Sequence, residues 1–134
     1  KKIRKKHKAY LVSRYKIKDF MSSLDTNKYY LFGFASDQSL RKIGKSYVNY
    51  FLGKKVPIFT GAERFAKDYN LKVVFADINR IKRGHYQTKF KVINDQKDSD
   101  YSITDQFIKL LEKQIYRDPS QYFWSHNRFK YIVD

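Results

Sequence analysis

The chain has 134 residues, and its composition is 42% apolar with 12 tyrosines and 11 phenylalanines. This amount of bulky apolar surface excludes an intrinsically disordered chain, and the length fits one domain. The absence of cysteine excludes disulfides, thiol nucleophiles and thiolate metal sites. No run of 18 apolar residues and no secretory signal occur, so we expect any membrane contact to be peripheral.

The charge is strongly positive, with 29 Lys and Arg against 13 Asp and Glu and a formal net charge of +16. Such an excess predicts a polyanionic partner. Phosphate-rich lipid, an anionic membrane face, an acidic carrier protein and nucleic acid all fit, and a merely solvated surface is the alternative. The sequence opens with a basic run, KKIRKKHK, and not with Met, so we expect a fragment or a processed chain.

The first third of the chain predicts a helix and two strands. Apolar residues at irregular spacing favour a helix over residues 9–24. The run YYLFGFA at Tyr29–Ala35 predicts a buried strand that delivers the polar SDQS segment to a loop. The run SYVNYFL at Ser46–Leu52 predicts a second strand, with a turn between Gly53 and Pro57.

The central part predicts a helix followed by a hairpin. Thr60 and Glu63 have capping-box spacing, so a helix is expected to begin near Thr60. Residues 71–81 carry β-branched and aromatic side chains typical of a buried strand. Residues 85–93 alternate with period two, as in a half-exposed strand, and Arg83-Gly84 is expected to form the turn.

The last third predicts a surface loop over residues 94–101 and a helix over residues 102–117, ended by Asp118-Pro119. Its expected apolar face carries Phe107, Leu110, Leu111 and Ile115. A short helix is expected within residues 120–130. Strands interleaved with helices predict an α/β fold, a mixed β-sheet flanked by helices. We expect a basic, partly helical segment over residues 1–28 and the α/β domain over residues 29–134.

No catalytic apparatus is evident in the sequence. A histidine oriented by a carboxylate five residues downstream would serve as a general base, but none of His7, His85 and His126 has Asp or Glu at that position. A Gly-rich phosphate loop, a zinc ligand set and a Ser nucleophile elbow are also missing.

Four segments in order resemble the lipid A lauroyl and myristoyl acyltransferases, in particular the type found in Bacteroidetes-like bacteria. They are FASDQS at Phe34–Ser39, YFLGKKVPIFTGAERFAKDYNLKVVFADI at Tyr50–Ile78, NRIKRGHYQTKF at Asn79–Phe90 and DPSQYFWSHNRFK at Asp118–Lys130. Asp37 stands where the related glycerolipid acyltransferases have the glutamate of their third motif, although the proline and glycine of that motif are missing. The resemblance implies part of a glycerolipid-acyltransferase-like fold.

The resemblance also implies a function. The parent enzyme of lipopolysaccharide synthesis is expected to move a fatty acyl chain from acyl carrier protein to a hydroxyl of a phosphorylated lipid A precursor, without a cofactor or a metal. It would act at the cytoplasmic face of the bacterial inner membrane, where an anionic surface is a further partner. This chain would be the C-terminal portion, without the His-x-x-x-x-Asp motif and inactive alone.

Seven residues are the expected acceptor-binding set, and no catalytic residue is assigned. They are Asp37, Gln38, Ser39, Arg41, Arg80, Lys82 and Arg83. The basic members suit charge-assisted hydrogen bonds to phosphate oxygens. An ordinary turn at Asp37-Gln38 and solvated charge elsewhere are the alternatives, and His126 with Trp124 is more typical of packing. The rival function is a small nucleic-acid-binding module, because basic residues alternate with aromatic ones; no nucleic-acid motif is present, so no nucleic-acid partner is expected.

Overall fold

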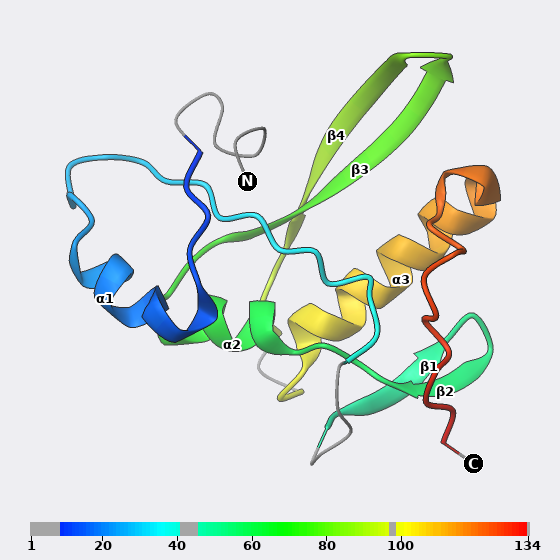
Figure 1. Cartoon of the computed structure of the whole chain (residues 1–134), viewed down its shortest axis with the longest axis horizontal. Helices are drawn as coiled ribbons and strands as arrows, with labels where there is room; N and C mark the ends of the chain where they lie inside the picture. The colour runs from blue at the N-terminus through cyan, green and yellow to red at the C-terminus, as the bar shows by residue number, and fades with distance from the viewer. Residues whose placement is uncertain (1–8, 41–45, 97–98, 134) are drawn as a thin grey trace. The chain divides into compact units, whose positions relative to one another are not determined.

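The computed structural model describes residues 9–40, 46–96 and 99–133. The chain divides into two units, Lys1–Gly33 and Phe34–Asp134 (Figure 1). The expected Arg41 site and the basic run at residues 1–8 lie outside the described residues.

In the unit Lys1–Gly33, the described residues 9–33 form a 3-10 turn, η2 (Arg14–Lys16), and a short helix, α1 (Ile17–Ser22). The Ser13 hydroxyl accepts a hydrogen bond from the Tyr15 N–H at the start of η2. The helix expected over residues 9–24 therefore forms only in its middle. Irregular apolar spacing explains this result, since no side chain of α1 is buried.

The strand expected at Tyr29–Ala35 is wrong, because this segment has no regular secondary structure. Tyr29 and Leu31 are exposed, at 105% and 85% of their full areas. An isolated extended segment satisfies its backbone polar groups with water unless another strand pairs with it. Within the described residues no strand pairs here, so apolar composition alone was a misleading signal.

The first hairpin joins β1 (Val48–Phe51) to β2 (Lys54–Pro57), with Phe51 opposite Lys54. Leu52 and Gly53 form the two-residue connection, with φ of 48° and 75°. Positive φ at both positions is the requirement of a type I′ turn, whose twist matches that of antiparallel strands. The first strand was predicted, but the residues expected to be a turn, Lys54–Pro57, form the second strand.

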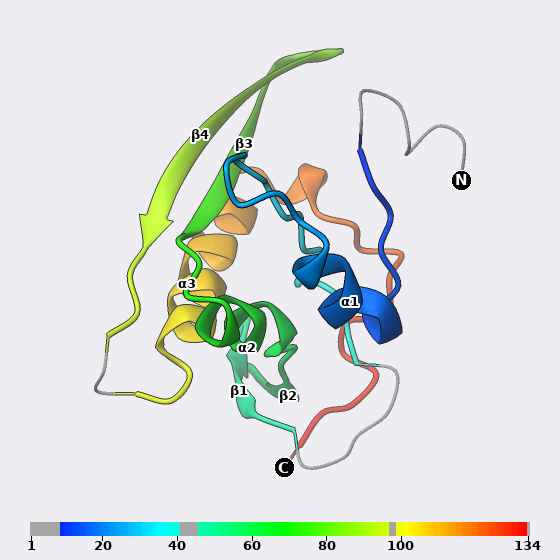
Figure 2. The same ribbon diagram turned by 90° about the vertical axis from the view of Figure 1, so that its left-hand side faces the viewer.

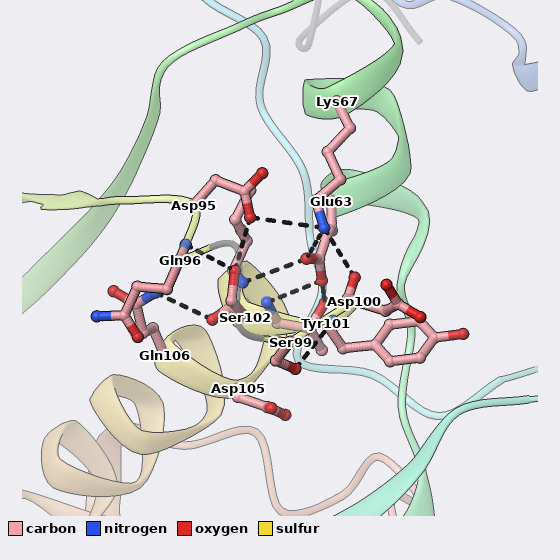
Figure 3. Close-up of polar contacts among 12 residues, drawn as sticks. Glu63, Lys67, Asp95, Gln96, Ser99, Asp100, Tyr101, Ser102, Asp105 and Gln106 are labelled. Carbon is pink, nitrogen blue, oxygen red and sulfur yellow. Dashed lines mark hydrogen bonds and ion pairs between the residues drawn. The ribbon is translucent and has the colours of Figure 1, made fainter.

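Helix α2 (Gly61–Asp68) begins where expected, with Thr60 at the N-cap position. The predicted capping box is wrong, because the Thr60 side chain makes no cap hydrogen bond. The Glu63 carboxylate accepts hydrogen bonds from the N–H groups of Ile103 (3.3 Å) and Thr104 (3.1 Å) in another helix (Figure 3). Glu63 therefore accepts hydrogen bonds from the start of α3, and not from the Thr60 N–H of its own helix as the capping box predicts.

The second hairpin joins β3 (Val73–Lys82) to β4 (His85–Ile93) in antiparallel register. Its turn is Arg83-Gly84, as predicted, and Gly84 has a φ of 78°. Both views show the turn projecting away from β1, β2 and α2 (Figures 1 and 2). The expected half-exposed pattern is not observed in β4, where every residue except Ile93 is exposed.

Helix α3 (Ser102–Arg117) has the predicted bounds and ends at Asp118. After it, a 3-10 turn, η3 (Pro119–Gln121), replaces the short helix expected within residues 120–130. The Asp118 carboxylate accepts from the Ser120 N–H at 3.2 Å, and the Trp124 indole N–H donates to the Pro119 carbonyl at 2.7 Å. These local bonds hold the C-terminal segment in an irregular path.

The core of the larger unit lies between the first hairpin, α2, β3 and α3. Its buried apolar members are Phe51, Val56, Ile58, Ala66, Phe75, Ile93, Ile103, Ile108, Leu111 and Ile115. Phe107 and Leu110 are only partly buried. Glu112 accepts the Leu52 N–H at 2.6 Å and secures the first hairpin turn to α3.

The content is mixed α/β, as predicted, but the strands among the described residues form two separate two-stranded antiparallel sheets where one mixed sheet was expected. In residues 9–40, 46–96 and 99–133, no helix is both long and apolar enough to cross a membrane.

Candidate functional site

The SDQS turn meets the C-terminal segment, although more than 80 residues separate them in the sequence. The Tyr122 hydroxyl donates to the Asp37 carbonyl at 3.1 Å. The Ser39 N–H donates to His126 Nε2 at 3.0 Å. Gln38 lies between these two anchored residues and is exposed. We call Asp37, Gln38, Ser39, Tyr122, His126 and Arg128 the turn site.

His126 acts in this geometry as an acceptor. Its Nε2 lone pair points to the Ser39 backbone N–H, and the Ser39 Oγ lies 3.3 Å from the same nitrogen. A general base needs a free lone pair directed at the hydroxyl that it deprotonates. Because a backbone donor already occupies this lone pair, His126 positions the turn and is not arranged as a base for Ser39.

Arg128 is the buried cation of the turn site, with 5% of its surface exposed. Its guanidinium carbon lies 5.0 Å from the centroid of the Phe51 ring, and Nη1 donates to the Pro57 carbonyl at 3.4 Å. Among the described residues no partner satisfies Nε. Burial lowers the pKa of Arg128, while Tyr122 and Asp37 act in the opposite direction. Packing on an aromatic face offsets part of the desolvation of this charge.

Tyr122 connects the turn site to the core. Burial raises the pKa of its hydroxyl, which the positive charge of Arg128 partly opposes. Its ring packs edge-on against Trp124 at a centroid distance of 4.9 Å and lies 6.2 Å from Phe51. The hydroxyl therefore stays protonated and donates to the Asp37 carbonyl.

Among the described residues, three of the expected basic site residues, Arg80, Lys82 and Arg83, make no contact with the turn site. Arg80 forms an ion pair with Asp118 at 3.6 Å and donates to the Ser120 hydroxyl at 3.0 Å. Lys82 and Arg83 are exposed at the end of the β3–β4 hairpin. Arg80 is thus committed to η3, whereas Lys82 and Arg83 form a separate cationic tip.

A second polar cluster surrounds Asp77, a buried carboxylate on β3. Arg117 Nη2 and Lys91 Nζ each lie 2.7 Å from its oxygens. The hydrogen bond from Arg117, and then that from Lys91, lower the pKa of Asp77 to about 2. This carboxylate is ionised near neutral pH and paired with two cations, so it ties the hairpin to α3 and is unsuited to proton transfer there.

A third cluster joins Tyr47 and Asn49 of the first hairpin region to Asp105 of α3. The Tyr47 hydroxyl and the Asn49 amide donate to Asp105 Oδ1 at 2.6 and 2.7 Å. Burial, followed by the hydrogen bond to Asp105, raises the pKa of Tyr47 to about 12. The phenol is therefore a donor that holds β1 on α3, and it cannot act as a base near neutral pH.

The fourth cluster lies between α2 and α3 (Figure 3). Glu63 receives the two backbone N–H groups already described and the Thr104 hydroxyl at 2.5 Å. Lys67 lies 3.0 Å from Glu63 and 3.5 Å from Asp95. The negative carboxylate lies at the positive end of the α3 dipole, so the arrangement stabilises the helix.

The sequence predicted a functional turn at Asp37, Gln38 and Ser39, but the aromatic and basic segment near the C-terminus was interpreted as packing. Tyr122, His126 and Arg128 were visible as an aromatic and basic run, yet no local spacing connects them to the turn. Only the fold reveals that connection.

Comparison with protein families yields a match that covers most of the chain. A family model described as bacterial lipid A biosynthesis acyltransferase matches residues 1–131. No curated protein and no solved structure matches the chain.

Proposed function

Because the chain belongs to the bacterial lipid A biosynthesis acyltransferase family, we propose that it supports transfer of a fatty acyl chain from acyl carrier protein to a hydroxyl of a lipid A precursor. Its role in that reaction is to bind the acceptor, as the C-terminal part of such an enzyme. The proposed location is peripheral, at the cytoplasmic face of the bacterial inner membrane.

The anchored turn at Asp37–Ser39 is the main support for acceptor binding. The Asp37 carbonyl and the Ser39 N–H are both held by the C-terminal segment, while the Gln38 side chain between them is exposed. A fixed backbone with one free amide side chain is pre-organised to hydrogen-bond a sugar hydroxyl or a phosphate oxygen. Pre-organisation matters because it reduces the entropy lost on binding.

The cationic tip, Lys82 and Arg83, would contact the phosphates of the lipid A precursor. Lys82 and Arg83 are exposed on the hairpin turn, which leaves their donors accessible to a ligand. Arg80 is held at η3 by Asp118 and Ser120, and Arg41 is the remaining member of the expected set. Both proposed partners, the carrier protein and the phosphorylated glycolipid, are acidic and match the charge of +16.

In this function the chemical step belongs to catalytic residues of the parent enzyme that are not in this sequence. Acyl transfer needs a base to remove the proton of the acceptor hydroxyl, and no His in the sequence has a carboxylate five residues downstream. His126, the one histidine at the turn site, already accepts from Ser39. We therefore expect acceptor binding by this chain without turnover.

The test is binding of a phosphorylated lipid A precursor to purified Gln38→Ala and Gln87→Ala variants. Gln87 is an exposed glutamine on β4 and serves as the matched control. Loss of one hydrogen bond at an anchored site costs about 1 kcal/mol, or roughly fivefold in affinity. Equal affinities for the two variants would contradict acceptor binding at the turn. Tight, salt-dependent binding to single-stranded oligonucleotide alone would favour the nucleic-acid alternative.

A further inference from the structure

The two long edges of the β3–β4 ribbon differ in the hydrogen-bond partners of their backbone groups. On the β3 edge, the Ile78 N–H donates to Gln114 Oε1 at 3.3 Å and the Ile78 carbonyl accepts from Arg117 Nη2 at 3.0 Å. Side chains of α3 therefore occupy the β3 edge at Ile78. Figures 1 and 2 show β4 as the outer strand, with β3 between it and α3.

The backbone groups on the β4 edge can be assigned from the register. Ile78 directs its N–H and carbonyl away from β4, so its partner Thr88 directs its own groups away from β3. Every second residue of β4 has this orientation, so the N–H and carbonyl groups of Tyr86 and Phe90 also point away from β3. In the described part of the chain, no strand or side chain pairs with these outward groups. A row of unpaired donors and acceptors is a template for another strand.

The same residues carry an exposed apolar face. Successive side chains alternate between faces, so Tyr86, Phe90 and Val92 lie on one face of β4. They are 63%, 67% and 66% exposed. On β3, Val74 and Ile78 lie opposite Val92 and Thr88 on this face and are 42% and 41% exposed. An added strand would bury this apolar row together with the polar edge.

The other face of β4 is basic. Lys89 and Lys91 lie on it, and because Lys91 is paired with Asp77 at 2.7 Å, the exposed Lys89 supplies the charge for an added strand. β4 itself contains no acidic residue. Cross-strand pairs of opposite charge stabilise a sheet, whereas like charges placed opposite each other destabilise it. The strand that fits this edge therefore has acidic residues on one face and apolar residues on the other.

We propose that the outer edge of β4 binds an extended polypeptide strand whose side chains alternate between apolar and acidic. A second copy of this chain is a poorer occupant, because pairing β4 with β4 would bring lysines close to lysines. A membrane is also a poorer occupant, because unpaired backbone groups in hydrocarbon cost several kcal/mol each. A strand satisfies both the backbone edge and the apolar face.

The test uses a labelled nine-residue peptide of alternating valine and glutamate, titrated into the full 134-residue chain. A peptide of the same composition with its valines and glutamates in separate blocks is the control. The variant Thr88→Pro removes an outward N–H while leaving the ladder to β3 intact, and Thr88→Ala keeps that N–H. We expect the alternating peptide to bind, and Thr88→Pro to weaken it roughly tenfold relative to Thr88→Ala.

Two further measurements keep the test decisive if Thr88→Pro does not fold. Hydrogen exchange at Thr88 and Phe90 is expected to slow when the alternating peptide is added. Lys89→Glu is expected to weaken binding of that peptide and to favour a peptide of alternating valine and lysine. Equal binding of the block peptide would overturn the proposal. So would dimerisation that protects Thr88 without peptide, or binding only to phosphatidylglycerol vesicles that Phe90→Ser abolishes.

Discussion

At the residue scale, the buried Glu63 takes the place of the cap that local spacing assigns to Thr60. Glu63 is 3% exposed and accepts from two N–H groups and one hydroxyl at the start of α3. Glu63→Ala would leave these donors buried and unpaired. We expect a loss of about 2–4 kcal/mol in the free energy of unfolding, measured by urea denaturation.

The matched variant for Glu63 is Thr60→Ala in the same helix. Sequence spacing alone predicts a cost of about 1 kcal/mol for this change. Because the Thr60 side chain makes no cap hydrogen bond, we now expect less than about 0.5 kcal/mol. A larger loss for Thr60→Ala than for Glu63→Ala would show that the cap is local after all.

Asp77 gives the larger unit a predictable sensitivity to acid. Its pKa is lowered to about 2 in the folded protein, from an ordinary value of 3.8. The stability that it contributes is therefore complete above its ordinary pKa and is lost as the pH falls from about 4 to about 2. Each pKa unit is worth about 1.4 kcal/mol. Solvent around Arg117 and Lys91 weakens the pairs, so we expect a contribution of about 1–2 kcal/mol.

The measurement is urea denaturation of the original protein and Asp77→Asn across that pH range. The difference between the two proteins is expected to be largest above about pH 4 and to shrink toward about pH 2. Asp68→Asn, which changes an exposed aspartate on α2, is the control and should leave the profile unchanged. A difference that does not vary with pH would contradict the assignment.

At the element scale, the β3–β4 hairpin depends on the conformation of its turn. Gly84 has a φ of 78°, and a Cβ added there meets nothing within 4 Å. The penalty of Gly84→Ala is therefore one of backbone strain and is expected to be about 1 kcal/mol. Gly33→Ala, at a position without positive φ and equally open, should be neutral. Thermal denaturation of both variants tests this expectation.

The cationic tip of the same hairpin is testable by ligand binding. Replacing Lys82 and Arg83 by glutamine is expected to weaken binding of a phosphorylated lipid A precursor at about 0.15 M salt, where distant exposed charges are screened. The control changes two exposed lysines of α3, Lys109 and Lys113, in the same way. Equal losses of affinity in the two double variants would contradict specific phosphate binding at the tip. So would equal affinity for precursor with and without its phosphates, since either result indicates only a diffuse electrostatic attraction.

At the scale of the whole molecule, the family match and the absent histidine–aspartate spacing lead to one prediction. We expect the purified chain to transfer no acyl group from acyl carrier protein to a lipid A precursor, while still binding the precursor. A radiolabelled acyl-transfer assay measures turnover directly. Protein-dependent product formation would contradict the proposed division between acceptor binding and the chemical step.

The sequence by itself determined the features that depend on local physics. The apolar period of α3 is maintained over four turns and ends at Asp118-Pro119, and the helix has the predicted bounds. The Arg83-Gly84 turn between two strand-like segments likewise produced the β3–β4 hairpin. The ordered set of motifs also identified the family that the comparison then showed.

Only the tertiary structure decided the features that need a distant partner. The run at Tyr29–Ala35 looks like a strand, but without a pairing strand in the described chain it remains irregular. Glu63 has capping-box spacing, but the α3 N-terminus offers it a buried site with more donors. His126 and Ser39 are 87 residues apart. Such contacts depend on how elements pack, and no local spacing in the sequence encodes that packing.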